Sequence, residues 1–137
     1  MKIVISHKEK SYQTEADSAQ FAGKKIGDEI DGSLVKAEAA GYKLVITGGS
    51  DSSGFPMRRD VHGQAIKKIV IGKGTGMRKT VKGLRMAKRV HGNTVEIKIA
   101  QLNTKVVLEG GKNLDELFPK TEKKEEKDKN KDKKKKK

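Results

Sequence analysis

One block of this chain collects its basic side chains and contains almost no acid, which limits where that block can lie in a fold. Residues 56–92 contain eleven Lys and Arg, including all five arginines, and a single acid, Asp60. So dense a charge cannot neutralise itself locally within a folded domain, so its charged side chains must face solvent or a partner. The block repels itself unless a polyanion supplies the counter-charge, and nucleic acid is the commonest such partner. The alternative interpretation is a solvated face that serves solubility alone.

The apolar side chains outside this block come in short runs separated by glycines. Hydrophobic residues make up 33% of the 137 residues, aromatics make up 4%, and 15 residues are glycine. β-branched and alternating runs predict strands, the last two paired as a hairpin, at 2–6, 11–15, 25–30, 42–47, 65–71, 94–99 and 103–108. Shorter signals predict helical turns at 16–22, 33–40 and 113–118.

This pattern favours a mainly β fold in a single domain over residues 1–119. We expect a small twisted antiparallel β-barrel with one or two short helices and long basic loops. Phe21, Tyr42 and Phe55 are expected in its core. Residues 120–137 contain no aliphatic or aromatic side chain, so they predict a disordered tail. Its lysines either contact phosphates as a mobile cationic segment or only aid solubility.

Several classes of protein are excluded by composition and motif spacing. No run approaches the roughly 18 apolar residues of a membrane helix, the apolar run at the N-terminus is too short for a signal peptide, and cysteine is absent. His7, His62 and His91 lack the spacing of metal ligands. Residues 72–80 fail the phosphate-loop pattern, because Arg78 stands where a glycine must precede Lys79. We therefore expect no enzyme, cofactor, metal or small-molecule substrate.

A glycine-rich segment follows the predicted strand at 42–47. Asp51 can accept hydrogen bonds from nearby backbone N–H groups, Gly54 permits a positive φ, and Pro56 restricts the exit. We predict a rigid, irregular loop that folds its apolar side chains back onto the core. The arginine pair that follows is thereby aimed at one surface.

This segment resembles the signature of the small-subunit ribosomal protein family S-six-e of archaea and eukaryotes, an apolar strand followed by G-G-x-D-x-x-G-F-P-M. The residues that match at the family's spacing are Gly48, Gly49, Asp51, Gly54, Phe55, Pro56 and Met57. Residues 58–63, 82–94 and 95–107 are similar in part, so the resemblance covers roughly residues 1–110.

The chain departs from the family pattern at a few places. Met77 stands where an aromatic is usual, His91 replaces an arginine, and members usually have charged residues in place of Leu84, Met86 and Ala87. The sequence after Lys120 contains no serine, so the kinase regulation of eukaryotic members is not inferred.

The resemblance implies a structural protein of the small ribosomal subunit, located on cytoplasmic ribosomes, with ribosomal RNA and neighbouring ribosomal proteins as partners. Arginine and lysine contacts to phosphates suit the shape-based recognition of A-form RNA, and the scarcity of aromatics argues against a stacking platform. The predicted RNA contacts are Arg58, Arg59, Lys67, Lys68, Lys73, Arg78, Lys79, Lys82, Arg85, Lys88, Arg89 and His91. The alternative is a free-standing RNA-binding translation accessory factor or RNA chaperone.

Overall fold

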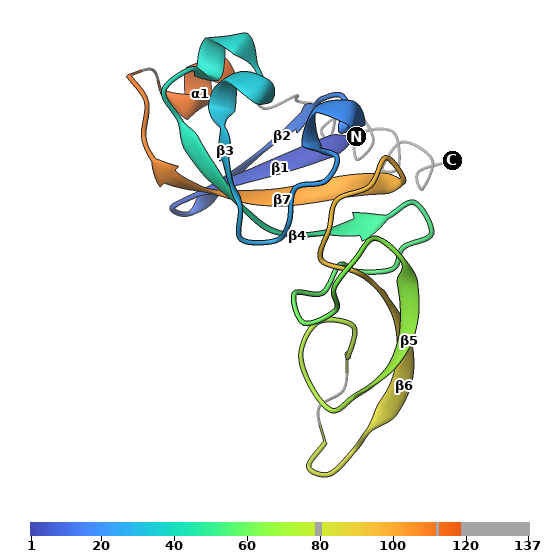
Figure 1. The fold of residues 1–137 in the computed structure, drawn as a ribbon. Helices are drawn as coiled ribbons and strands as arrows, with labels where there is room; N and C mark the ends of the chain where they lie inside the picture. Colours follow the sequence, from blue (N-terminus) through green and yellow to red (C-terminus); the bar gives the residue numbers. More distant parts are fainter. Residues whose placement is uncertain (79–80, 112, 119–137) are drawn as a thin grey trace, which may run out of the picture.

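The fold consists of a sheet-based body and an arm on the side of the sheet away from the helical turns (Figure 1). A computed structural model describes residues 1–78, 81–111 and 113–118. The body is built on a five-stranded sheet of β1 (Lys2–His7), β2 (Lys10–Glu15), β3 (Glu29–Asp31), β4 (Lys43–Asp51) and β7 (Ile99–Leu108). The arm comprises residues 61–78 and 81–91 and contains the antiparallel strands β5 (Ile66–Ile71) and β6 (Met86–His91).

The body sheet is mixed and open. Its strand order is β2–β1–β7–β4–β3. β1 runs parallel to β7, with Lys2 opposite Gln101, whereas the other neighbouring strands are antiparallel. The edge strands β2 and β3 do not pair with each other within the described residues. The prediction of a mainly β fold is confirmed, but that of an antiparallel barrel is wrong, because helical turns cover the core in place of a second wall of strands.

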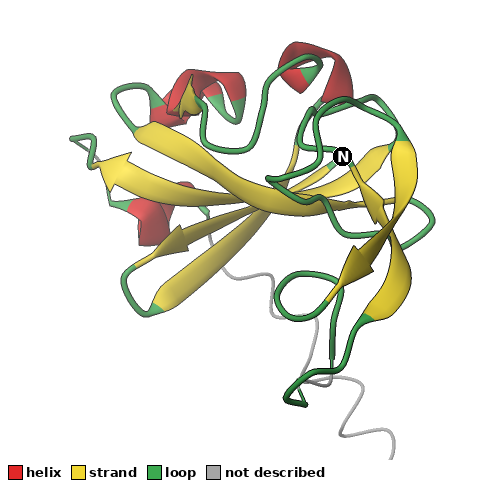
Figure 2. Cartoon of the chain, turned by 60° about the horizontal axis from the view of Figure 1, so that its bottom comes forward, coloured by secondary structure: helices red, strands yellow, loops and turns green. Residues whose placement is uncertain are grey.

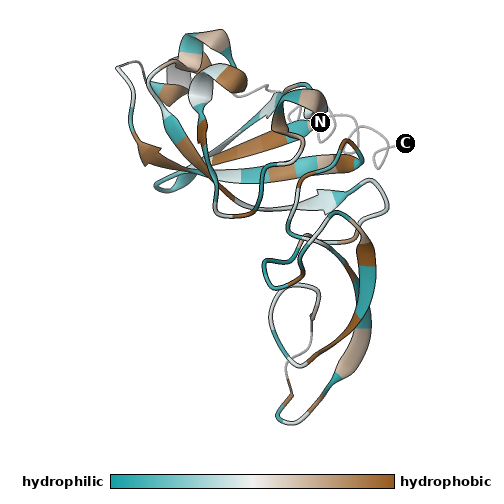
Figure 3. Ribbon diagram, in the orientation of Figure 1, coloured by the Kyte–Doolittle hydropathy of each residue, from teal (hydrophilic) through white to brown (hydrophobic). Residues whose placement is uncertain are grey.

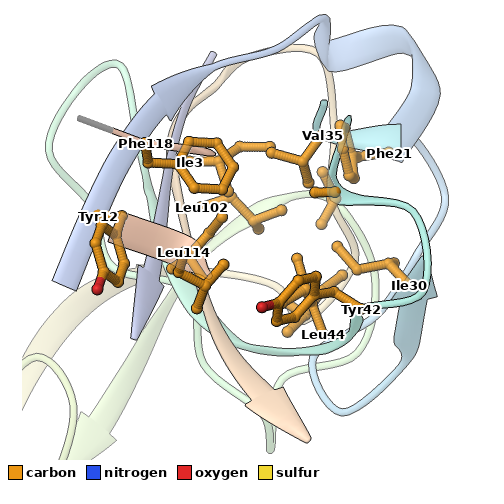
Figure 4. Close-up of a cluster of buried hydrophobic side chains, with 14 of the residues drawn as sticks. Ile3, Tyr12, Phe21, Ile30, Val35, Tyr42, Leu44, Leu102, Leu114 and Phe118 are labelled. Atoms are coloured by element: carbon orange, nitrogen blue, oxygen red, sulfur yellow. The ribbon is translucent and has the colours of Figure 1, made fainter. Parts of the chain in front are cut away.

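The core lies between one face of the body sheet and these helical turns (Figure 4). Alternate strand residues are buried, as at Ile3 and Ile5 of β1 and at Leu44 and Ile46 of β4. Above them pack buried side chains from three 3₁₀ turns or the residues beside them and from helix α1 (Leu114–Leu117), including Phe21, Val35, Ala39, Leu114 and Phe118. Figure 2 shows that these helical segments all lie on the body and none on the arm.

Most of the predicted elements are present, and they are shorter where the signal is weak. Strands form as expected in the ranges 42–47 and 65–71, and the helical turn predicted at 113–118 is α1. The helical turns predicted at 16–22 and 33–40 appear as short 3₁₀ segments. No helix in the described ranges is long and apolar enough to cross a membrane. The tail predicted at 120–137 lies outside the described residues.

The hairpin predicted between 94–99 and 103–108 is wrong. The second of these ranges belongs to one long strand, β7, and residues 95–98 lie in no strand. Val95 is fully buried and its N–H donates to the carbonyl of Lys24 at 2.7 Å, whereas Ile97 is 68% exposed. The alternation of apolar residues that resembles a strand therefore comes from a loop anchored at one buried valine.

Two predicted core aromatics are placed as expected and one is not. Phe21 and Tyr42 are buried in the core, but Phe55 is half-buried and lies outside it. Its neighbour Met57 is 2% exposed and fills that role instead. The chain returns to the core between these two positions, so only the second of them lies inside it.

The arm has a small apolar cluster of its own. Val61, Ile71 and Val90 are buried there, with Ile69 and Met77 packed against them. Figure 3 shows hydrophilic and hydrophobic residues following each other along the strands of the arm. Strand β6 occupies residues expected to be a basic loop, since the run from Met86 to His91 contains little β-branched signal. It forms because β5 supplies a partner for its backbone.

The glycine-rich segment is a tight reversal rather than an irregular loop. β4 continues through it to Asp51, whose carboxylate accepts from the backbone N–H of Ser52 at 2.5 Å and from the Ser52 hydroxyl at 3.0 Å. Gly54 has a φ of +82°, as its place in the turn requires. The predicted turn chemistry is thus confirmed, and the chain returns along the end of β4.

The returning residues 56–58 join the body to the arm, and we call this the junction. On one side, the N–H of Met57 donates to the carbonyl of Gly49 at 2.8 Å. On the other, the N–H of Arg58 donates to His91, whose own N–H donates to the carbonyl of Pro56 at 2.9 Å. The end of β4 is therefore linked to the end of β6 through one shared segment of backbone.

Gly49 is required at the junction by close packing rather than by its φ. A Cβ atom there would lie 2.6 Å from the carbonyl oxygen of Gln101 and 3.0 Å from Sδ of Met57. At Gly48 a Cβ would meet no atom within 4 Å. The two adjacent glycines thus form a matched pair, one crowded and one free.

We expect Gly49→Ala to lower the free energy of unfolding by about 1–3 kcal/mol, because backbone must shift to admit the methyl group. Gly48→Ala should change it by less than about 0.5 kcal/mol. Urea denaturation of both variants beside the parent chain measures the difference. Equal changes in the two variants would contradict the assignment of crowding to Gly49.

Candidate nucleic-acid interface

The arm exposes its basic side chains without acidic partners. Its solvent-exposed cations are Lys67, Lys68, Lys73, Arg78, Lys82, Arg85, Lys88 and Arg89. Within the described residues, none of these eight forms an ion pair with a carboxylate. The arm therefore presents positive charge that the described part of the chain leaves uncompensated, which suits a polyanionic partner.

Two of these cations stand directly opposite each other on neighbouring strands. Lys68 of β5 is in register with Arg89 of β6, so both side chains lie on the same face of the arm. The buried Ile71 and Val90 belong to the opposite face. Like charges in this position destabilise a strand pair, and an external anion between them removes that cost.

The residues that connect the ends of β5 and β6 form a second basic feature. They line a hollow of about 410 Å³ whose walls include Lys73, Lys82 and Arg85. Gly72 and Gly83 also line it, and Gly83 has a φ of +81°. Glycines leave backbone N–H groups open to approach, so this hollow can accept a phosphate among three cations.

Arg58 is held as a structural brace. Its guanidinium donates from Nε and Nη2 to Oδ2 of Asp60 at 2.8 and 2.6 Å, and from Nη1 to the carbonyl of Thr75 at 3.2 Å. Its side chain is 18% exposed. Hydrogen bonding from Arg58 lowers the pKa of the Asp60 carboxyl. The one acid of the basic block thus helps to hold residues 57–60, which we call the foot of the arm.

Two other predicted contacts lie in different settings, and a third lies outside the described residues. Arg59 is exposed, and among the described residues its side chain has no acidic partner. His91 is 1% exposed, with Nδ1 3.1 Å from the carbonyl oxygen of Gly92 and Nε2 3.9 Å from a carboxylate oxygen of Glu96. A side chain so buried cannot reach a ligand, so His91 is a packing residue of the junction. Lys79 lies outside the described residues.

Asn93 is a key residue that sequence reasoning did not single out. It is 7% exposed, and its Oδ1 accepts from the N–H of Gly63 at 3.3 Å and from the Thr94 hydroxyl at 3.1 Å. Its Nδ2 donates to the carbonyl of Arg59 at 3.4 Å. One amide therefore ties both ends of the arm together. The available signal was an Asn beside a Gly directly after the basic block, which also fits an ordinary turn.

The charge of the arm suits the binding of an anionic partner. In the described ranges, no group of three His, Cys, Asp or Glu side chains is placed to hold a metal ion. The exposed side chains of the arm include eight cations, which can neutralise and position phosphates.

Comparison with known proteins assigns the chain to a family. The family model described as ribosomal protein S6e matches residues 1–119. A small ribosomal subunit protein eS6 of Methanococcus maripaludis strain C5 is 50% identical over 108 residues, which are 77% of this chain and 86% of that protein.

Two further proteins of the same name agree with this. The one from Methanosphaera stadtmanae is 43% identical over 128 residues, which cover 91% of this chain and 97% of the relative. The one from Methanocaldococcus jannaschii is 47% identical over 107 residues, covering 78% and 80%. The resemblance carried by the glycine-rich segment is thus confirmed along nearly the whole described chain, and this chain belongs to the ribosomal protein S6e family.

Proposed function

We propose that the chain is a structural constituent of the small ribosomal subunit and binds ribosomal RNA through the arm. The observation that supports this most directly is the set of eight exposed cations on the arm, none paired with an acid in the described residues. The S6e family supplies the setting, since the relatives are named as small ribosomal subunit proteins. In this proposal the chain lies on cytoplasmic ribosomes, beside other proteins of the small subunit.

The contacts are to phosphates and to the shape of the RNA. Lysines and arginines lie along both strands and around the connecting hollow, so they can follow a backbone over some length. The arm is a hairpin joined to the body by the hydrogen bonds of the junction, and the register of its strands sets where these groups lie. A-form RNA, whose phosphates line its grooves, is the matching partner. His91 is left out of the contact set because it is buried.

The alternative, a free-standing RNA-binding accessory factor or chaperone, differs in how firmly the protein is held. A structural constituent remains with small subunits through a high-salt wash, whereas a factor that binds transiently is released. Co-sedimentation of the tagged chain with subunits before and after such a wash separates the two. Release at moderate salt would favour the accessory factor.

We expect the arm, rather than the lysine-rich tail, to account for most of the specific affinity. Combined replacement of Arg78, Arg85 and Arg89 by Ala should prevent stable incorporation into small subunits, because it removes three phosphate contacts from a folded frame. Deletion of residues 120–137 should reduce incorporation only mildly. The measurement is the amount of each variant in purified subunits relative to a parent chain expressed beside it. Loss of incorporation on tail deletion alone would contradict the proposal.

Lys68→Glu should have opposite effects on the free arm and on RNA binding. The new carboxylate faces Arg89 across the strands, so the arm should gain about 0.2–1 kcal/mol and its amide exchange should slow. RNA affinity should fall, since a phosphate contact becomes a repulsion.

Lys43→Glu is the control for this change, because it alters the net charge equally at the start of β4, in the body. It also places a like charge opposite Asp31 on the neighbouring strand, so it should not stabilise the body sheet. We expect it to weaken binding to subunit RNA much less than Lys68→Glu does. Equal losses in the two variants would mean that total charge, and not the arm, governs binding.

A further inference from the structure

A cavity lies where the foot of the arm meets the body sheet. Its volume is about 470 Å³, within the range of about 300–1,000 Å³ that is usual for small-molecule sites. It is lined from the body by residues 26–27 and 45–47, and from the arm and its foot by residues 57–60 and 74–75. The cavity therefore depends on the arm being held at one angle to the sheet.

Apolar side chains line one side of this cavity, which we call its floor, and a hydrogen-bonded arginine lines another, which we call its wall. Ile26 and Val45 are half-buried and line the cavity with apolar surface, and the buried Met57, which is 2% exposed, lies beside them. The wall is Arg58, fixed by its two hydrogen bonds to Asp60 and by its bond to the carbonyl of Thr75.

Arg59 supplies a second cationic group that is not engaged in this way. Its Nη2 lies over Gly27, 3.7 Å from where a Cβ would stand, and in the described part of the chain it has no acidic partner. A planar guanidinium above an apolar floor can stack on a flat ring and donate hydrogen bonds to its edge. The surrounding Thr47 and Thr75 make the rim polar.

We propose that this cavity holds one unpaired nucleotide turned out of the bound ribosomal RNA, with its base between Arg59 and the apolar floor. The inference rests on the proposed function, since the cations of the arm would hold the flanking backbone. An extruded base is the ligand that fits, because bases in single-stranded loops and bulges are the part of RNA that proteins read specifically. A cavity at the foot of the phosphate-binding arm thus adds a base contact to a surface that otherwise recognises shape.

Ultraviolet crosslinking of purified small subunits tests this, because it joins proteins to bases in direct contact rather than to phosphates. Mass spectrometry of the crosslinked peptides should show a base attached to residues 57–60 or 74–75, and sequencing should place that base at an unpaired position. Thr75→Phe fills the cavity and should lower this crosslink by about tenfold, since one stacked base contact is worth that much. Gln13→Phe adds the same side chain on β2 and should leave it unchanged.

A second pair of variants separates the base contact from charge. Arg59→Gln and Lys43→Gln each remove one positive charge, and only the first should lose the crosslink. Millimolar AMP should not compete, because the nucleotide is held by its flanking RNA. If free AMP abolishes the crosslink, the cavity is instead a site for a soluble nucleotide and the inference is wrong.

The amount of protein in the subunits distinguishes the two proposals. Stoichiometric incorporation without a base crosslink at the cavity, or a crosslink unchanged by Thr75→Phe, would overturn the inference and leave the proposed function standing. Absence of the chain from salt-washed subunits would overturn the proposed function itself.

Discussion

The arrangement of the whole molecule depends on a few backbone hydrogen bonds at the junction. Residues 56–58 bond to Gly49 on one side and to His91 on the other, so a single short segment links the two sheets. A shift of that segment would change the position of the arm relative to the body sheet. The glycine at 49, the buried imidazole at 91 and the amide of Asn93 all serve to keep it in place. The angle of the arm, and with it the cavity at its foot, follows from this local geometry.

The arm can carry its charge because a small apolar cluster on one face holds its two strands together. Val90 and Ile71 on one face bury enough apolar surface to hold the strands together. Lys68 and Arg89 on the other face are left to repel each other in water. This repulsion weakens the free hairpin by a fraction of the stability that its cluster provides. The same repulsion is relieved by an anion, so stability and binding are coupled through one pair of side chains.

The sequence predicted those parts of the fold in which local signals and tertiary contacts agree. The β-branched runs in β4 and β5 and the turn at Asp51 and Gly54 are of this kind. β6 was missed because its residues have no strand signal without the partner strand. The barrel was wrong because nothing local shows that β1 would pair with β7 in parallel.

The candidate site was predicted as a set of charges but not as a geometry. The exposure of Lys68 and Arg89 follows from their chemistry, whereas burial of His91 and the bracing role of Arg58 arise from contacts made across the junction.

The parallel pairing of β1 with β7 also sets an order of events during synthesis. The central strand of the body is the last strand to be made, so the body sheet cannot form until nearly all of it has left the ribosome. The hairpin of β5 and β6 needs only neighbouring residues and is complete earlier. The nascent chain therefore contains both strands of its basic arm before the body sheet that will hold that arm can form.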